Sequence, residues 1–310
     1  MVKLVLLSQG DKTPHSNRLT PQASRVLRWM RSRFLQHFTL VVLSFVCAIT
    51  LAACKGSSPL GMIAPSLPTS SGNSSPTEVT TLRVALDPTF PPFQSKVSEG
   101  KFEGFDIDLI NAIAEVEGLE LDLEALPFDV IIPALQSKSI DLTISTMTIT
   151  PERSKVIDFS QPYFKSGQAI AVQKTTTDIR DEADLKGKTV GVQMSSVSAE
   201  KANTLEGVTV RNFEDVALAL KQLTNGSVDA VISDAPVILY AIKNGSANGI
   251  KLAGEWLTEE YYGIAAPKDS PNLEKINAGL ATLIENGRYK EIYQKWFSGE
   301  PPQLPEKAPL

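Results

Sequence analysis

From residue 81 onward, short apolar runs alternate with longer segments in which apolar residues recur every three or four positions. The short runs are 82–86, 119–126, 141–145, 189–193, 208–212 and 230–233. The helical segments are 105–116, 130–135, 199–205, 215–223, 273–284 and one around 289–296. This alternation predicts an α/β fold whose largely parallel sheets are covered by helices. A segment of about 230 residues fits one large domain or two modest ones.

An uncharged, mostly apolar run lies near the other end of the chain. It covers the sixteen residues from Phe38 to Ala53 and follows a stretch with four arginines between residues 25 and 33. A basic stretch followed by an apolar segment too short to cross about 30 Å of hydrocarbon is typical of a secretory signal. We therefore predict a signal peptide over residues 1–53, with an uncleaved membrane anchor as the alternative. Met30 offers a second start, which would make residues 1–29 an upstream extension.

The predicted signal ends in Leu51-Ala-Ala-Cys54, which resembles the lipobox of bacterial lipoproteins. The resemblance implies that Cys54 is lipidated and anchors an exported protein to a membrane, in the periplasm or on the outer face of the cytoplasmic membrane. Residues 54–80 are predicted to be a tether, because 14 of the 26 residues from 55 to 80 are Ser, Pro or Gly. The Pro-rich residues 301–310 are expected to form a loose tail.

Cleavage before Cys54 would remove most of the chemistry that sulfur and imidazole supply. Both histidines, His15 and His37, and the other cysteine, Cys47, precede the cut. We therefore expect no disulfide, no Cys or His metal site, no Ser-His or Cys-His nucleophile and no cofactor. Residues 1–53 carry seven Lys or Arg against one acid, so removing their charge of +6 from the total of −5 leaves −11. Such an acidic body argues against nucleic acid as a partner.

The first candidate for ligand chemistry lies between residues 146 and 160. Thr150 can cap a helix that Pro151 opens, since the missing N–H of proline would be unpaired there in any case. Arg153 then falls in the first turn, where backbone N–H groups and a guanidinium together favour an anion such as a carboxylate. A solvated surface arginine is the alternative.

Acidic and aromatic candidates are each ambiguous when taken alone. Asp234 follows the predicted strand 230–233 and precedes Ala235-Pro236, so it is either a ligand group or a helix N-cap. Asp87 ends the first strand before a proline and is either a ligand group or a turn residue. Phe90 and Phe128 would by default belong to the core.

These candidates lie in a series of short blocks. The blocks are Asp87-Pro-Thr-Phe90 with Pro92-Phe93, Gly104-Phe-Asp-Ile-Asp108, Phe128-Asp-Val-Ile-Ile-Pro133, Thr148-Ile-Thr-Pro-Glu-Arg153 with Ile157-Asp-Phe-Ser160, Asp229-Ala-Val-Ile-Ser-Asp234, Tyr262-Gly-Ile-Ala, Glu285-Asn-Gly287 and Lys295-Trp-Phe297. Spread over residues 82–297, they closely resemble the polar amino-acid binding proteins of bacterial ABC importers, solute-binding family 3, which includes the glutamine-binding protein. The resemblance implies a two-lobed, periplasmic-binding-protein-like fold of type II, with mixed sheets flanked by helices and a two-segment hinge.

The resemblance also implies the ligand-binding residues. A free amino acid would lie in the cleft, with Arg153 on its α-carboxylate and Asp234 on its α-ammonium group. The other implied residues are Ser145, Thr146 and Thr148 for backbone and hydroxyl bonds, Ser195 and Ser196 for main-chain donors from the second lobe, and Asp87, Phe90, Phe128 and Gln193 around the ligand side chain. A zwitterion needs such a fixed cation and fixed anion, and aromatic walls strengthen both by excluding water.

The implied lobes are discontinuous in sequence. Lobe 1 would consist of residues 81–165 and 262–300, and lobe 2 of residues 166–261. The two hinge segments would be 164–167 and 259–262. Closure of the lobes around the ligand would create the surface that the transmembrane subunits of the permease recognise. The protein is expected to act as a monomer.

The charges of the predicted site restrict the class of amino acid that we expect as the ligand. Once Arg153 and Asp234 have neutralised the ligand backbone, Asp87 would repel an acidic side chain. Where the glutamine binder has a lysine and a histidine, this chain has Gln193 and Ser233, and both changes favour a cationic ligand. We therefore expect a substrate-binding lipoprotein of an ABC importer for a polar, non-acidic amino acid, with glutamine and the basic amino acids arginine and lysine left open.

Two other classes of function remain. Related two-lobed proteins include dehydratases and peptidoglycan lyases, and Glu103 or Glu152 could act as a general acid or base. A ligand sensor would need a partner to transmit its signal. The pairing of Arg153 with Asp234 and the loss of both histidines favour a binding protein over an enzyme.

Overall fold

The structure is a computed structural model that describes residues 80–309. The predicted signal peptide, the alternative start at Met30, the lipidation site Cys54 and the tether before residue 80 lie outside the described residues. Across residues 80–309, the helices are all too short or too polar to cross a bilayer. Residues 301–309 contain neither helix nor strand.

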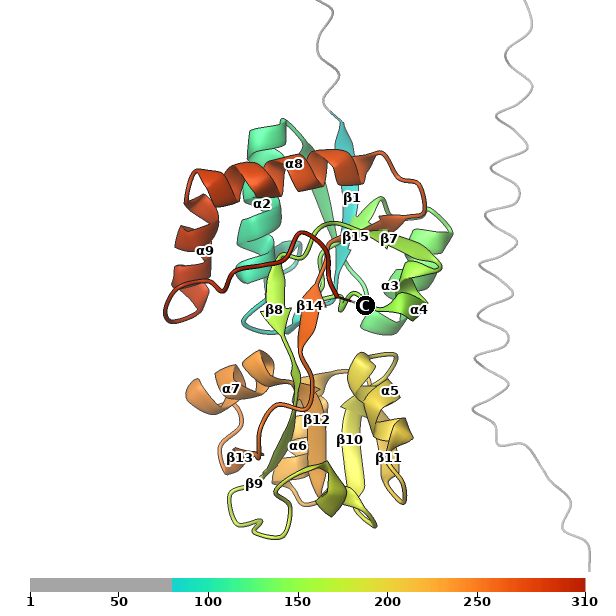
Figure 1. Cartoon of the computed structure of the whole chain (residues 1–310), viewed down its shortest axis with the longest axis vertical. Coiled ribbons are helices and arrows are strands. Elements are labelled where there is room, and N and C mark those ends of the chain that lie inside the picture. Colours follow the sequence, from blue (N-terminus) through green and yellow to red (C-terminus); the bar gives the residue numbers. More distant parts are fainter. Residues whose placement is uncertain (1–79, 310) are drawn as a thin grey trace, which may run out of the picture. The chain divides into compact units, whose positions relative to one another are not determined.

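The first lobe is built on a five-stranded sheet in the order β5-β1-β6-β15-β7 (Figure 1). Its strands are β1 (Thr81–Leu86), β5 (Glu120–Ala125), β6 (Leu142–Thr143), β7 (Ile157–Phe159) and β15 (Ala265–Pro267). Strand β1 pairs in parallel with β5 and β6, whereas β15 runs antiparallel to β6 and β7. The helices of this lobe are α2 (Phe105–Glu117), α3 (Phe128–Gln136), α4 (Pro151–Ser154), α8 (Asn272–Glu285) and α9 (Arg288–Trp296).

A second five-stranded sheet, in the order β11-β10-β12-β9-β13, forms the second lobe. Its strands are β9 (Gln168–Gln173), β10 (Thr189–Gln193), β11 (Thr209–Phe213), β12 (Ala230–Asp234) and β13 (Ile250–Ala253). Strand β10 is parallel to β11 and β12, and β9 is antiparallel to β12 and β13, so the two lobes share one topology. The helices of this lobe are α5 (Val197–Thr204), α6 (Val216–Thr224), α7 (Ala235–Lys243) and the short 3-10 helix η1 (Glu182–Leu185).

Two strands connect the lobes. The chain leaves the first lobe through β8 (Phe164–Ser166) and returns through β14 (Glu260–Tyr262), and the two strands pair antiparallel between the lobes (Figure 1). The predicted fold class, with two lobes, mixed sheets and a two-segment connection, is confirmed.

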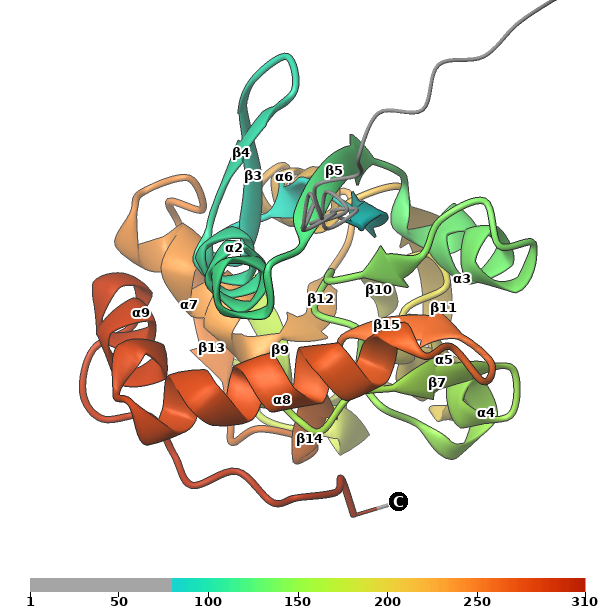
Figure 2. The same cartoon turned by 90° about the horizontal axis from the view of Figure 1, so that it is seen from above.

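Helices cover both faces of each sheet because the central strands are apolar on both sides. In β12, Ile232 packs with Ala199 and Ala202 of α5, while Val231 belongs to the cluster that contains Leu220 of α6. In the first lobe, α2 and α8 pack together on one face, and α3 covers Ala85 of β1 on the other (Figure 2). Strands buried on both faces lack polar alternation, which explains their continuous apolar runs.

The alternating pattern missed the antiparallel elements. Strands β9 and β15 were not predicted and run opposite to the other strands of their sheets; both are almost fully buried, and a buried apolar strand has the same kind of sequence in either direction. Helix α7 was also not predicted, because a short and nearly continuous apolar run fits a buried strand as well as a helix. A further three-stranded sheet, β2 (Thr89–Phe90), β3 (Gln94–Ser98) and β4 (Lys101–Glu103), carries a hairpin that extends from the first lobe in Figure 2.

Gly104 is a position where the fold requires glycine. Its φ is +140°, and a Cβ atom added there would lie 1.9 Å from the carbonyl oxygen of Phe93. We expect Gly104→Ala to lower the free energy of unfolding by about 2 kcal/mol, because both the backbone and the neighbouring strand must shift. Urea unfolding measures the change. Gly100→Ala is the control, since Gly100 also has positive φ but no atom within 4 Å of an added Cβ; equal losses in both variants would contradict the steric argument.

Candidate functional site

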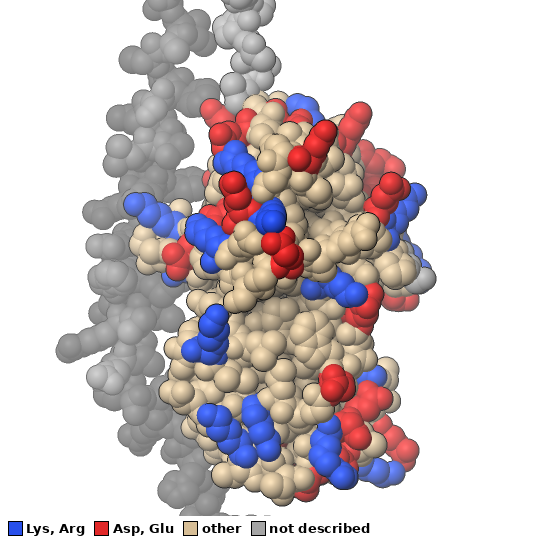
Figure 3. All heavy atoms as spheres, turned by 60° about the vertical axis from the view of Figure 1, so that its left-hand side comes forward, with Lys and Arg blue, Asp and Glu red and all other residues tan. Residues whose placement is uncertain are grey.

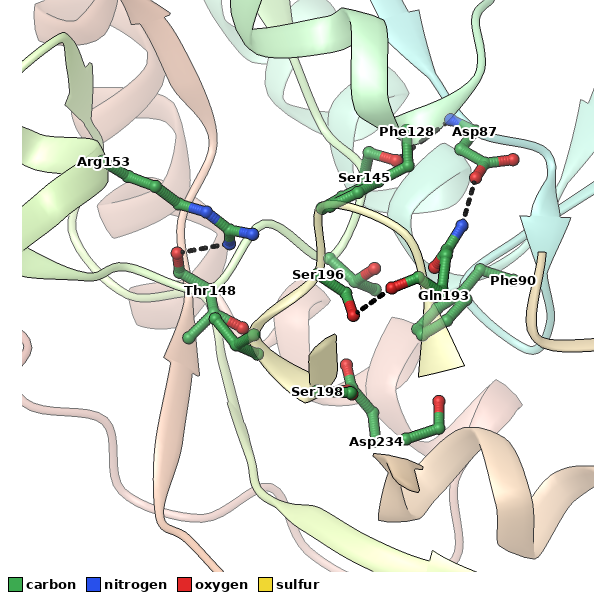
Figure 4. Close-up of a pocket in the computed structure, with 13 residues that line it drawn as sticks. Asp87, Phe90, Phe128, Ser145, Thr148, Arg153, Gln193, Ser196, Ser198 and Asp234 are labelled. Atoms are coloured by element: carbon green, nitrogen blue, oxygen red, sulfur yellow. Dashed lines mark hydrogen bonds between the residues drawn. The ribbon is translucent and has the colours of Figure 1, made fainter. Parts of the chain in front are cut away.

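Four of the candidate side chains lie where parallel strands end. Asp87 directly follows β1 and Ser145 follows β6 in the first lobe, while Gln193 ends β10 and Asp234 ends β12 in the second. The carboxyl ends of parallel strands share one edge of a sheet, which is where open α/β sheets bind ligands. The two edges contribute to one pocket between the lobes (Figure 4).

Arg153 is buried in this pocket, with 5% of its surface exposed. Its Nη1 donates to the carbonyl of Thr148 at 3.0 Å, and its Nη2 donates across the cleft to the carbonyl of Ser195 at 3.2 Å. The guanidinium carbon lies 5.5 Å from the centre of the Phe128 ring. Burial lowers the pKa of Arg153, and Glu200, Asp234 and Glu260 act against that shift. Arginine remains charged under such conditions, so the pocket holds a desolvated cation.

The expected helix cap before Arg153 is present, but the helix is short. The hydroxyl of Thr150 accepts a hydrogen bond from the Arg153 N–H at 3.2 Å, as the sequence predicts. Helix α4, however, covers only the four residues Pro151–Ser154. A single turn has little macrodipole, so the attraction for an anion rests on the guanidinium and not on the helix end. The alternative of a solvated Arg153 is wrong, because the side chain is buried.

Asp234 occupies the N-cap position of α7 without capping it. One carboxylate oxygen accepts from Gln168 Nε2 at 2.5 Å, and the other accepts from the Tyr262 hydroxyl. Burial, followed by repulsion from Glu260, raises the pKa of Asp234 to about 7; the donors Tyr262 and Gln168 and the charge of Arg153 act in the opposite direction. The carboxyl group is therefore poised to gain a cationic partner, which would favour its ionised form.

Asp87 lies at the other end of the pocket. It accepts hydrogen bonds from the Thr89 hydroxyl at 2.7 Å and the Thr89 N–H at 3.2 Å, in the manner of a turn residue. Its second oxygen accepts from Gln193 Nε2 across the cleft at 2.9 Å. Burial raises the pKa of Asp87, and the bonds from Thr89 and Gln193 partly offset this. No cation faces Asp87 among the contacts of the described residues, so it contributes uncompensated negative charge.

Most of the predicted site residues meet in this pocket. Its lining contains Asp87, Phe90, Phe128, Ser145, Thr146, Thr148, Arg153, Gln193, Ser196 and Asp234 from the predicted set, together with Val197, Ser198 and Ser233. Ser195 is absent from the lining: its φ is +60° and its carbonyl accepts from Arg153, so the structure gives it an acceptor role toward Arg153. Val197 and Ser198 were missed, although they directly follow the predicted Ser195-Ser196 pair.

Thr146 and Thr148 are held by residues outside the lining. Thr146 has a φ of +48°, and its N–H donates to the buried carboxylate of Asp106 at 3.2 Å. The Thr148 hydroxyl donates to Glu260 Oε2 at 3.1 Å. Glu260 begins the connecting strand β14, within the predicted hinge segment 259–262, and Gln168 begins β9 just after the other connecting strand; neither was predicted as a site residue.

The pocket is narrow in this arrangement. Its cavity volume is only about 20 Å³. The bonds from Gln193 to Asp87 and from Arg153 to Ser195 cross it from lobe to lobe. An amino acid could therefore enter only if the lobes or these side chains moved apart.

A larger hollow lies on the opposite side of the connecting strands, between α7 and α9. It measures about 540 Å³ and is lined largely by aromatic and aliphatic side chains, including Phe164, Tyr240, Trp256 and Phe297. Figure 3 looks onto this side, where uncharged residues cover most of the area between the lobes. Its only charged lining residues are Lys165 and Lys243, so it has no pair of opposite charges for a zwitterion. Among residues 80–309, no cluster of three or more metal-ligating side chains is found.

Comparisons with known proteins identify the family. Residues 82–299 match the family model of bacterial extracellular solute-binding proteins, family 3. The chain is 36% identical over 223 residues to a probable histidine-binding protein of Neisseria gonorrhoeae, covering 70% of this chain and 83% of that protein. It is 38% identical over 209 residues to the ABC transporter glutamine-binding protein GlnH of Bacillus subtilis, covering 66% and 76%.

Solved structures of amino-acid-binding proteins are also similar to this chain. An ancestral arginine-binding protein, solved with arginine, is 47% identical with a TM-score of 0.68 and covers 70% of this chain and 98% of that one. An ancestral arginine-binding protein solved with glutamine is also 47% identical, with a TM-score of 0.67 and coverage of 71% and 98%. An ancestral amino acid-binding protein, a precursor of cyclohexadienyl dehydratase, is 37% identical with a TM-score of 0.65, covering 70% and 96%.

The pocket of opposed charges, the two-lobed topology and the matches over residues 82–299 lead to one conclusion. The chain belongs to the bacterial extracellular solute-binding proteins of family 3, which are exported proteins, and its relatives in this family include amino-acid-binding proteins.

Proposed function

We propose that this protein binds a free basic amino acid, with arginine preferred, and delivers it to the permease of an ABC importer. Arg153 binds the α-carboxylate, and Asp234 binds the α-ammonium group. The observation that carries the proposal is the presence of a buried cation and a buried anion in one pocket that spans both lobes. Charge-assisted hydrogen bonds in such dry surroundings give both affinity and orientation.

Charge beyond this pair supports a cationic side chain. Asp87 is left for the ligand side chain, and Glu214 and Asp215 line a neighbouring hollow that Asp87 also lines. Burial raises the pKa of Asp87 most, and repulsion from the Asp215 carboxylate adds a smaller rise. A guanidinium or ammonium group placed there would relieve that repulsion, whereas a carboxylate would add to it.

Glutamine is the second candidate. An ancestral arginine-binding protein has been solved with glutamine as well as with arginine, and the chain is also similar to a glutamine-binding protein. The Gln193 amide and the Asp87 carboxylate could pair with a side-chain amide. Neutral glutamine, however, leaves the charge of Asp87 uncompensated, which is why we place it after arginine.

Delivery adds two further parts to the proposal. The lobes close on the ligand about β8 and β14, and the closed form docks on the transmembrane subunits as a monomer held to the membrane through lipidated Cys54. Support comes from the two connecting strands, from the narrow pocket and from the ABC transporter to which the relative in Bacillus subtilis belongs. The ligand is released unchanged, so we propose no turnover.

A thermal-shift screen of residues 55–310 against the twenty amino acids tests the ligand. Binding to the folded state alone raises the melting temperature in proportion to the logarithm of ligand concentration over Kd. We expect arginine to give the largest shift, lysine, histidine and glutamine smaller ones, and glutamate and aspartate none. A larger shift with glutamate would contradict the charge argument, and no shift with any amino acid would contradict the proposed function.

A further inference from the structure

Asp234 does not stand alone in the pocket wall. In the pairing of β12 with β9 it lies directly opposite Gln168, whose amide donates to Oδ1 at 2.5 Å. The Tyr262 hydroxyl, from the connecting strand β14, bonds to Oδ2. Each oxygen of the carboxylate therefore has a donor from a chain segment at the junction of the lobes.

Tyr262 is fully buried and its hydroxyl has two partners, Asp234 and the Ser166 hydroxyl at 2.7 Å. A tyrosine hydroxyl carries one hydrogen. If that hydrogen goes to the carboxylate, Tyr262 must accept the hydrogen of Ser166. When Asp234 is ionised, Ser166 thus donates to Tyr262 and Tyr262 donates to Asp234. This series of hydrogen bonds ends on the carboxylate that we propose binds the ligand.

Each charged group that faces Asp234 can be named. Glu260 on β14 repels it, and Arg153 on α4 attracts it. Glu260 also accepts from Gln168 Nε2 at 3.1 Å, so the two carboxylates share one amide donor. The other oxygen of Glu260 has a donor of its own, the Thr258 hydroxyl at 2.7 Å. With Gln168 shared, the Tyr262 hydroxyl is the donor on which Asp234 depends most among these contacts.

We propose that Tyr262 is a positioning residue for amino-acid binding: its hydroxyl favours the ionised form of the Asp234 carboxylate and orients it toward the ligand ammonium group. The effect on ligand binding rests on the proposed function, whereas the effect of the hydroxyl on the Asp234 carboxyl group does not. Removing the hydroxyl leaves the carboxylate buried beside Glu260 with one donor fewer, which favours the protonated form. A protonated Asp234 can still accept a hydrogen bond from an ammonium group, but it cannot form an ion pair with it.

Binding should therefore depend on pH in a defined way. The pKa of Asp234 is about 7 without ligand, so a ligand that requires the ionised form must displace a proton at lower pH. Affinity falls as pH drops below that value. Loss of a hydrogen bond to a charged group raises the pKa by about 1 pH unit, which reduces the ionised fraction by about ninefold at pH 6, about fivefold at pH 7 and less than twofold at pH 8.5.

The test compares Tyr262→Phe with Tyr261→Phe. The neighbouring Tyr261 hydroxyl donates to Glu259 at 2.7 Å, away from the pocket, so its removal is a matched control. Calorimetric titration with arginine at pH 6, 7 and 8.5 should show the graded loss for Tyr262→Phe and none for Tyr261→Phe. A loss of equal size at all three pH values would show a structural role only and would overturn the inference.

A second readout needs no ligand. Carbon NMR of labelled aspartate carboxyl groups, with Asp234→Asn to assign the resonance, should show a higher Asp234 pKa in Tyr262→Phe and a smaller rise in Ser166→Ala. An unchanged pKa in Tyr262→Phe would overturn the inference whatever the binding data show. A wild-type protein that binds no amino acid, yet shows the expected pKa rise, would overturn the proposed function and leave the role of the hydroxyl intact.

Discussion

Replacing Arg153 by alanine should weaken the binding of arginine by about a hundredfold, equivalent to about 3 kcal/mol. The guanidinium is buried against Phe128 and is the cation of the pocket to which we assign the ligand carboxylate. Without it, the carboxylate would enter a dry site that already contains Asp234 and Asp87. Isothermal titration calorimetry on the mature protein measures the loss.

Two further variants separate the effect of the Arg153 charge from the effect of its planar geometry. Arg153→Lys keeps the charge but loses the planar fork, so it should recover part of the affinity and remain about tenfold weaker than wild type. Arg180→Ala removes an exposed arginine that pairs with Asp184 on the second lobe and should leave binding unchanged. Near-wild-type affinity in Arg153→Ala, with thermal stability preserved, would refute the assignment of the carboxylate site.

Replacing Asp87 by asparagine should change selectivity. We expect arginine to lose about fiftyfold in affinity and glutamine less than threefold, because only the guanidinium depends on the negative charge. Asparagine keeps an oxygen acceptor for Thr89, so the turn that starts at Asp87 should survive. Competition between arginine and glutamine in the same titration reports the ratio directly.

Asp215→Asn is the control for long-range charge. Asp215 caps α6 by accepting from the Leu218 N–H at 2.6 Å, and asparagine caps helices equally well. The variant removes one negative charge close to Asp87 without touching the pocket lining, so it should cost arginine only about twofold. Equal losses for arginine and glutamine in Asp87→Asn would contradict a cationic side-chain site.

Much of the fold follows from local pattern. The helix at 105–116 and the strands at 189–193 and 230–233 were predicted to within a residue or two, because they have clear periodicity or compact apolar runs. Helix α7 and the antiparallel strands β9 and β15 were not, since their sequences are almost continuously apolar. Direction and pairing depend on contacts between distant segments, which no local window contains.

The site residues also divide into those that the sequence predicted and those that it did not. Arg153, Asp234 and Asp87 could be named from their places after strands and from family motifs, and all three line the pocket. Gln168 was not named, and Tyr262 and Glu260 appeared only within a family motif or a predicted hinge segment and not as site residues, because sequence does not show which side chains a buried carboxylate contacts. Their importance arises from the register that sets Gln168 opposite Asp234 and from the strand that brings Tyr262 to it.

Residue types and their spacing were enough to predict the α/β class, the family, and the charged residues that a zwitterion would need, and they show that no histidine follows residue 37. Tertiary structure alone decided which groups share a pocket, that α4 is too short to attract an anion by its dipole, and that Asp234 is held by donors from the connecting strands. The reason is physical: residue type and spacing fix local conformation and formal charge, whereas burial and hydrogen-bond partners, which set pKa and affinity, come from segments far apart in the chain.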